Sequence, residues 1–229
     1  MAHIGVIEEL EKQGFEIASI AGTSMGALVG GVYAAGQLKA YKDWVYTLDK
    51  YKVFSLVDFT LSSMGFIKGD KVLNRMKEFI SDAHIEDLPI PYAAVAVDII
   101  NHEEVVFTNG SIFDAIRASI SIPTIFTPVK TDKGLLVDGG VMNNIPVNHV
   151  KRIDGDILVV VNVNAFIPAD KPKKSKEENQ KSWFTHQNKL KEFYNHLLSN
   201  NQKSKEEHLG YFNLLTRTIS LMTHKMAQM

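Results

Sequence analysis

The stretch Ile20-Ala21-Gly22-Thr23-Ser24-Met25-Gly26-Ala27-Leu28 decides the fold of this chain. An apolar segment of strand length, residues 15–21, leads into it, and residues 27–36, which are rich in small apolar side chains, follow it. The Gly-x-Ser-x-Gly pattern over residues 22–26 is typical of a sharp strand-to-helix turn, where flanking glycines let two backbones approach closely. The sequence therefore predicts a strand, a tight turn and a buried helix, with Ser24 at the carboxyl end of a sheet.

The segments on either side alternate between helical and strand patterns. Upstream, the apolar residues of 2–13 recur at helical spacing, and Gly14 ends that helix. Downstream, the patterns predict two helices, one capped by Asp70 and running to residue 80, the other capped by Ser111 and running to 119. They also predict paired strands at 92–100 and 104–108, short strands at 125–129 and 135–137, and a strand at 156–163. Strands that alternate with helices predict an α/β fold with a largely parallel central sheet.

The length and composition of the chain fit one globular domain. It has 229 residues, of which 45% are hydrophobic and 22% charged. We expect residues 1–167 to form the α/β core, residues 168–182 a polar Lys-rich loop, and residues 183–229 an amphipathic helical extension of the same domain. No stretch approaches the roughly 18 apolar residues of a membrane-spanning helix, and the N-terminus does not resemble a signal peptide. We therefore expect a cytoplasmic protein with, at most, peripheral membrane contact.

Charge and cysteine content exclude several classes of function. Lys and Arg number 25 against 26 Asp and Glu, so the formal net charge of -1 gives no reason to expect nucleic acid as a partner. The chain has no cysteine, which excludes disulfides, thiolate metal sites and a thiol nucleophile. No paired histidines or clustered acids have metal-ligand spacing. We expect neither a metal nor a cofactor.

A serine nucleophile needs a base to take its proton, and Asp138 is the strongest candidate. It ends the strand pattern of 135–137 and precedes Gly139-Gly140, where the backbone can approach another segment closely. None of the eight histidines lies in a convincing motif; His149, for example, follows Pro146 on an expected helix. Taken alone, each pattern also fits a structural role, because glycine-rich turns and Asp-Gly-Gly turns are common.

Together, the two patterns resemble the patatin-like phospholipases of bacterial type. The likeness extends to His3–Ile7, to Ile116-Arg117-Ala118-Ser119 with Ile122-Pro123, and to Asn144–Val147. The resemblance implies a three-layer α/β/α fold and a Ser-Asp dyad, in which Ser24 attacks an ester to form an acyl-enzyme. Asp138 would take the serine proton and later activate water. The residues implied to shape the nucleophile turn and the site are Gly22, Thr23, Met25, Gly26, Gly139 and Gly140.

The resemblance also implies a substrate and exposes a departure from the family pattern. The substrate would be a phospholipid or another fatty acyl ester. Family members begin with a strand and a glycine-rich loop whose amides form the oxyanion hole, whereas only Met1-Ala2 precede His3 here. Because one lost oxyanion donor costs about 10²–10³ in rate, we expect the printed chain to be inactive or weak. We also expect part of the C-terminus to be missing, and an open sheet edge that favours a homo-oligomer.

Two other readings remain open at this point. The chain could be a non-catalytic patatin-fold protein that binds an acyl chain or a partner protein and keeps Ser24 because the turn needs a small residue. It could also be a histidine-dependent α/β-hydrolase, which requires a histidine late in the chain held against an acid; His149 follows Asp138 by only eleven residues.

Overall fold

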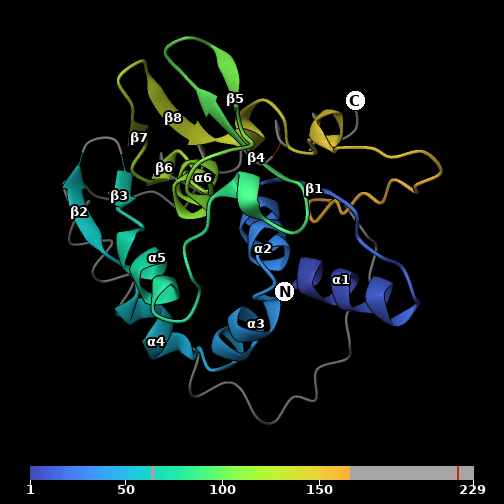
Figure 1. The fold of residues 1–229 in the computed structure, drawn as a ribbon. Coiled ribbons are helices and arrows are strands. Elements are labelled where there is room, and N and C mark those ends of the chain that lie inside the picture. Colours follow the sequence, from blue (N-terminus) through green and yellow to red (C-terminus); the bar gives the residue numbers. More distant parts are fainter. Residues whose placement is uncertain (63–64, 166–220, 222–229) are drawn as a thin grey trace, which may run out of the picture. The chain divides into compact units, whose positions relative to one another are not determined.

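The computed structural model describes residues 1–62, 65–165 and 221. The helices are α1 (Ala2–Lys12), α2 (Met25–Ala34), α3 (Leu38–Tyr46), α4 (Lys50–Ser55), α5 (Asp70–Lys77) and α6 (Ile112–Ser119), with short 3-10 helices η1 (Ile85–Asp87), η2 (Gly139–Val141) and η3 (Val147–His149). The strands are β1 (Ile20–Thr23), β2 (Phe59–Ser62), β3 (Gly65–Ile67), β4 (Tyr92–Asp98), β5 (Glu103–Phe107), β6 (Thr124–Phe126), β7 (Val129–Lys130) and β8 (Leu135–Asp138), as Figure 1 shows.

Strand β4 organises the main sheet. It pairs in parallel with β1 and antiparallel with β5 and β8, and β7 extends the sheet beyond β8. A smaller sheet contains β2, β3 and β6. The α/β fold class is confirmed, and the main sheet is mixed: its parallel pair is β1–β4, next to the Ser24 turn. Strand β5 runs the other way because β4–β5 is a hairpin, whose strands must be antiparallel, and β8 is antiparallel to β4 as well.

Both faces of β4 are buried along its whole length. Small side chains, Ala94 and Ala96, point to one face, where α2 and α6 pack against the strand and against each other. Val95 and Val97 alternate with them on the opposite face and are also buried. A strand covered on both faces is what a layered α/β arrangement requires.

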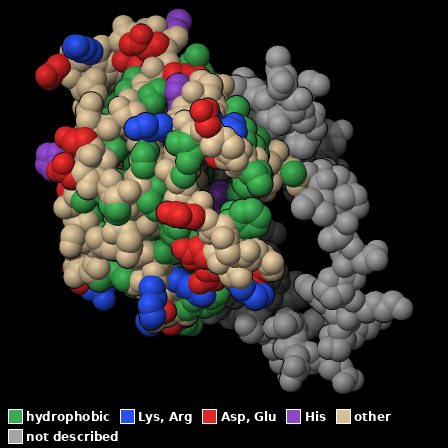
Figure 2. Space-filling model, turned by 45° about the vertical axis from the view of Figure 1, so that its right-hand side comes forward, with side chains coloured by type: hydrophobic (Ala, Val, Ile, Leu, Met, Phe, Trp, Pro, Cys, Tyr) green, Lys and Arg blue, Asp and Glu red, His purple; other side chains and the backbone are tan. Residues whose placement is uncertain are grey.

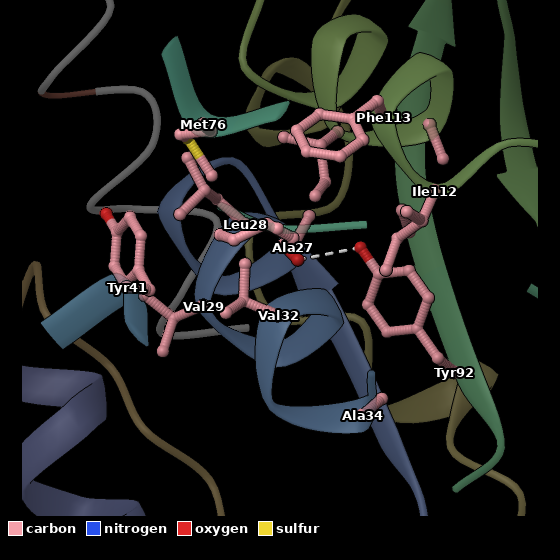
Figure 3. Close-up of a cluster of buried hydrophobic side chains, with 14 of the residues drawn as sticks. Ala27, Leu28, Val29, Val32, Ala34, Tyr41, Met76, Tyr92, Ile112 and Phe113 are labelled. Atoms are coloured by element: carbon pink, nitrogen blue, oxygen red, sulfur yellow. Dashed lines mark hydrogen bonds between the residues drawn. The ribbon is translucent and has the colours of Figure 1, made fainter. Parts of the chain in front are cut away.

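A buried side-chain hydrogen bond lies in the core around α2. The Tyr92 hydroxyl at the start of β4 donates to the Ala27 carbonyl oxygen in the first turn of α2, over 2.7 Å, the dashed line in Figure 3. Around it lie the large buried side chains Phe113 and Ile112 of α6 and Met76 of α5. A buried hydroxyl needs a hydrogen-bond partner, so this bond also fixes how α2 sits on the sheet.

Several elements lie where the sequence pattern predicts them. The predicted helix over 2–13 is confirmed as α1, and the hairpin of 92–100 and 104–108 is confirmed as β4–β5. Ser111 caps α6 as expected, because its Oγ accepts from the Asp114 N–H at 3.2 Å. The strand expected from residue 15 begins only at Ile20. The strand expected over 125–129 is divided between β6 and β7.

Asp70 is not the cap of α5, so that prediction was wrong. Gly69, at φ 80°, occupies the cap position and Asp70 lies in the first turn. The capping carboxylate comes from Asp58, which accepts from the N–H groups of Gly69, Asp70 and Lys71 at 2.7, 2.9 and 3.1 Å. A distant carboxylate thus replaces the local cap, an arrangement that local sequence rules cannot detect.

The strand predicted at 156–163 is also wrong. Residues 157–163 form no ladder, although they are the most strand-like run in the chain. Ile157, Val159 and Val160 are 71%, 50% and 48% exposed. Strand propensity reflects packing and pairing with a neighbour, and among the described residues this run has no strand beside it.

The expected loop at 168–182 and helical extension at 183–229 lie outside the described residues, apart from position 221. Within the described part, no helix has the length and apolar character needed to cross a bilayer. On the face drawn in Figure 2, positive and negative side chains are interspersed along the lower edge of the described atoms. This agrees with the nearly balanced composition.

Replacing Gly22 should unfold the turn between β1 and α2. An alanine Cβ at Gly22 would lie 2.4 Å from the Gly26 carbonyl carbon and 2.5 Å from the Ala27 nitrogen, both backbone atoms that cannot move aside. We expect Gly22→Ala to lower the free energy of unfolding by about 3 kcal/mol or more, measured by urea denaturation.

The matched control is Gly5→Ala on α1, where a Cβ would meet nothing within 4 Å. Because alanine favours helix over glycine, this change should stabilise by roughly 0.5–1 kcal/mol. Equal stability of the two variants would show that the Gly22 contact does not hold β1 against α2.

Candidate active site

The register of the main sheet brings Ser24 and Asp138 together. Strand β1 pairs with the first half of β4, ending with Thr23 opposite Val95, and β8 pairs with the second half, ending with Asp138 opposite Ala96. Because β5 occupies the other edge of β4 from Ala94 onward, β1 and β8 must share one edge. Their carboxyl ends therefore meet head to head on β4, with Ser24 and Asp138 at the junction.

Ser24 has a backbone conformation that few non-glycine residues adopt. Its φ is 56° and its ψ is -121°, between the end of β1 and the start of α2. Such a conformation costs about 1–3 kcal/mol and persists only where the surrounding structure enforces it. It lifts a half-buried hydroxyl away from the sheet at the N-terminus of α2, where free helix N–H groups gather.

Asp138 is buried, with 6% of its surface exposed. Its Oδ1 accepts from the Gly140 N–H at 2.8 Å, whereas its buried Oδ2 has no hydrogen-bond partner among the described residues. Burial raises the pKa of Asp138 above its ordinary value, while the Ser24 side chain and the Gly140 N–H act in the opposite direction. One carboxylate oxygen is thus buried and free to accept a proton.

The glycines named from the sequence differ in what they do. Gly139 lies against β4, because a Cβ there would be 2.3 Å from the Val95 carbonyl oxygen. At Gly140 a Cβ would approach Asp138 Oδ1 to 3.1 Å, so this glycine keeps space beside the carboxylate. Gly26 has room for a methyl group, with His3 Nε2 the nearest atom at 3.8 Å. Of these three positions, Gly139 therefore has the least room for a side chain.

A largely apolar cavity of about 830 Å³ contains both Ser24 and Asp138 in its wall. The wall includes residues 15–26, with the exposed Met25, and residues 157–164, which belong to no strand. Apolar side chains from α1 and the proline-containing turns complete the lining: Val6, Ile7, Leu10, Pro123, Ile145 and Pro146.

His3 and His149 differ in whether they line the cavity. His149 does not line the cavity that contains Ser24; its Nε2 lies 2.9 Å from Glu104 Oε2, on β5. His3 does line the cavity, and its pKa is lowered chiefly by burial and further by the N-terminal charge. Its position at the start of α1 gave no signal of this, because the approach to Gly26 depends on how two helices pack.

Two further contacts at the site were not expected from the sequence. The Thr23 hydroxyl donates to the Asn143 carbonyl oxygen at 2.8 Å, which ties the end of β1 to the loop after Asp138. The Ser24 N–H donates to the Ser119 Oγ at 2.9 Å. No local pattern singles out Ser119, because its contact with Ser24 crosses 95 residues of sequence.

Comparison with known proteins agrees with this geometry. Residues 1–151 match the family model described as Patatin-like phospholipase. An uncharacterized NTE family protein of Mycobacterium bovis is 40% identical over 163 residues, which cover 71% of this chain and 45% of that protein. Another, from Mycobacterium tuberculosis, is 33% identical over 175 residues, 74% of this chain and 29% of that protein.

Some more distant relatives have names that state an enzymatic activity. The lysophospholipase NTE1 of Yarrowia lipolytica is 29% identical over 175 residues, 72% of this chain and 12% of that protein. The chain spans less than half the length of each of these relatives.

Asp138→Asn should stabilise the fold at neutral pH. A group whose folded pKa is raised favours the folded state at low pH and loses that contribution as the pH rises through the folded pKa. The neutral amide avoids the buried charge, so we expect a gain of about 1 kcal/mol at pH 7. Urea denaturation at pH 7 and near pH 4 measures it; the gain should shrink toward the acidic end, and a constant difference would contradict the assignment.

Proposed function

Because this chain belongs to the patatin-like phospholipase family, we propose that it is a serine lipid acyl hydrolase with Ser24 as nucleophile and Asp138 as base. The observation that carries the proposal is the head-to-head meeting of β1 and β8 along β4, with both side chains in the wall of one cavity. Family membership supports a lipid hydrolase in general, and the assignment of the two residues is our own.

The proposed reaction has two halves. Ser24 Oγ attacks the ester carbonyl carbon while Asp138 accepts the serine proton on Oδ2, the oxygen without another partner. The tetrahedral adduct expels the alcohol, which leaves with that proton, and an acyl-enzyme remains. Water then attacks the acyl carbon and gives its proton to Asp138. As the fatty acid leaves, Asp138 passes that proton to Ser24 Oγ, which restores both the serine hydroxyl and the carboxylate.

Stabilisation of the oxyanion would come in part from the first turn of α2. The earliest bond within this helix runs from the Leu28 N–H to the Ser24 carbonyl oxygen, so the N–H groups of residues 25–27 have no acceptor within the helix. In nucleophile turns of this kind, the N–H after the serine, here Met25, is one oxyanion donor and a second segment supplies another.

The apolar lining of the cavity favours an acyl chain, and the lysophospholipase name of more distant relatives suggests the ester to test first. We propose a lysophospholipid or a related fatty acyl ester as substrate. The test compares p-nitrophenyl butyrate with 1-palmitoyl lysophosphatidylcholine.

Covalent labelling tests the nucleophile directly. A fluorophosphonate probe should label the wild-type chain once, at Ser24, and Ser24→Ala should abolish labelling. Asp138→Asn should slow it by about 10²–10⁴-fold, because the serine proton loses its acceptor. The readout is intact-mass spectrometry with peptide mapping. Labelling is the first measurement because it reports on the reactive serine itself and does not depend on the choice of ester substrate.

The control separates this proposal from a histidine-dependent hydrolase. His149→Gln should leave the labelling rate within about twofold, since His149 faces Glu104 outside the cavity. A folded wild-type protein that is neither labelled nor active on either ester would support the non-catalytic acyl-chain or protein-binding alternative instead.

The labelling rate should also depend on pH through Asp138. Only the carboxylate can act as base, and burial raises its pKa above the ordinary value of about 3.9. We therefore expect the rate to fall on the acidic side with a midpoint above that value, measured across pH 4 to 8. A midpoint at or below the ordinary value would argue against a buried Asp138 as base.

A further inference from the structure

The residues that end α6 contact both halves of the proposed dyad. Ser119, the last residue of α6, is fully buried and accepts the Ser24 N–H on its Oγ at 2.9 Å. Two residues later, the Ser121 carbonyl oxygen accepts the Asp138 N–H at 3.0 Å. One short segment therefore holds the backbones of two residues that come from different strands.

The Ser119 hydroxyl makes two hydrogen bonds at once. While it accepts from Ser24, it donates to the Val95 carbonyl oxygen of β4 at 2.6 Å. Among the small side chains, a hydroxyl is the group that is both a strong donor and a strong acceptor. Ser119 therefore ties the Ser24 turn to the sheet at Val95, the residue that lies opposite Thr23 in the β1–β4 register.

The segment is itself held in place. The Arg117 guanidinium donates to the Ser121 Oγ at 2.6 Å and to the Thr127 carbonyl oxygen at 3.0 Å, and it also contacts the Lys68 carbonyl oxygen. The Ser121 hydroxyl in turn donates to the Arg117 carbonyl oxygen at 2.8 Å. A guanidinium with several acceptors in a fixed plane limits movement of the segment more than a single bond would.

We propose that Ser119 is a positioning residue for the Ser24 nucleophile, and that the segment 117–121 sets the spacing between Ser24 and Asp138. This inference rests on the proposed function. The turn at Ser24 has an unfavourable φ of 56°, so its N–H must be held from outside β1 and α2. Without the hydroxyl, the Ser24 N–H and the Val95 carbonyl oxygen would both lose a buried partner.

The test compares Ser119→Ala with Ser119→Cys and with a control on the same helix. Ser111→Ala removes the cap at the other end of α6, where Ser111 Oγ accepts from Asp114 and donates to Asp82, without touching the site. It measures the effect of a weaker α6 alone. The thiol of Ser119→Cys is somewhat larger than the hydroxyl and is a weaker donor and acceptor, so its effect on the hydrogen bonds should be intermediate.

Two readouts are needed. In ¹H–¹⁵N NMR, the Ser24 amide should exchange about tenfold faster in Ser119→Ala than in the wild type or in Ser111→Ala. With p-nitrophenyl butyrate and the fluorophosphonate probe, Ser119→Ala should lower kcat and the labelling rate by about 10–100-fold while KM stays within about twofold. Ser111→Ala should leave both rates unchanged.

The outcomes separate this proposal from the proposed function. Unchanged Ser24 exchange, or unchanged kcat and labelling in Ser119→Ala, would overturn the positioning role while leaving the hydrolase intact. A rate loss in Ser111→Ala equal to that in Ser119→Ala would also overturn it, because helix stability would then explain both. A wild-type protein that is inert toward both probes would overturn the hydrolase, and with it a role for Ser119 in placing a nucleophile.

Discussion

The structure depends on the close contact between the backbone at Gly22, in β1, and the carbonyl group of Gly26, in α2. This contact makes the chain reverse direction within a few residues, which gives Ser24 its unfavourable backbone conformation and points the first amides of α2 toward its hydroxyl. The position of α2 on the sheet, fixed by the Tyr92–Ala27 hydrogen bond, follows from the same turn. A side chain at Gly22 would therefore disturb the fold and the site together.

Local patterns predicted the elements that local interactions form. Helix α1, the β4–β5 hairpin and the Ser111 cap follow from periodicity, turn residues and a cap within three residues of its target. The cap of α5 did not follow, because Asp58 reaches its amides from eleven to thirteen residues away. The run at 157–163 has strand residues and no ladder, since propensity alone cannot supply a neighbouring strand.

The candidate site, too, could be predicted from the sequence only in part. Ser24 and Asp138 could be named from the sequence because each lies in a short glycine-containing pattern. Their meeting could not be derived from it, since it depends on β1 and β8 sharing one edge of β4. Ser119, Thr23 with Asn143, and His3 contribute through contacts between distant segments, and none of them has a local pattern that announces its contact.

The pairing of β1 leaves room for α6 to contact the end of this strand. Among the described strands, β1 pairs with β4 alone, and its four residues line the cavity. A central strand with two neighbours is located by ladders on both sides, whereas β1 has four residue pairs with β4. The end of β1 therefore needs further fixed points, and Ser119 from α6 and Asn143 from the loop after Asp138 supply them. Because these two segments also adjoin Asp138, the segments that hold the Ser24 turn are the ones that hold Asp138.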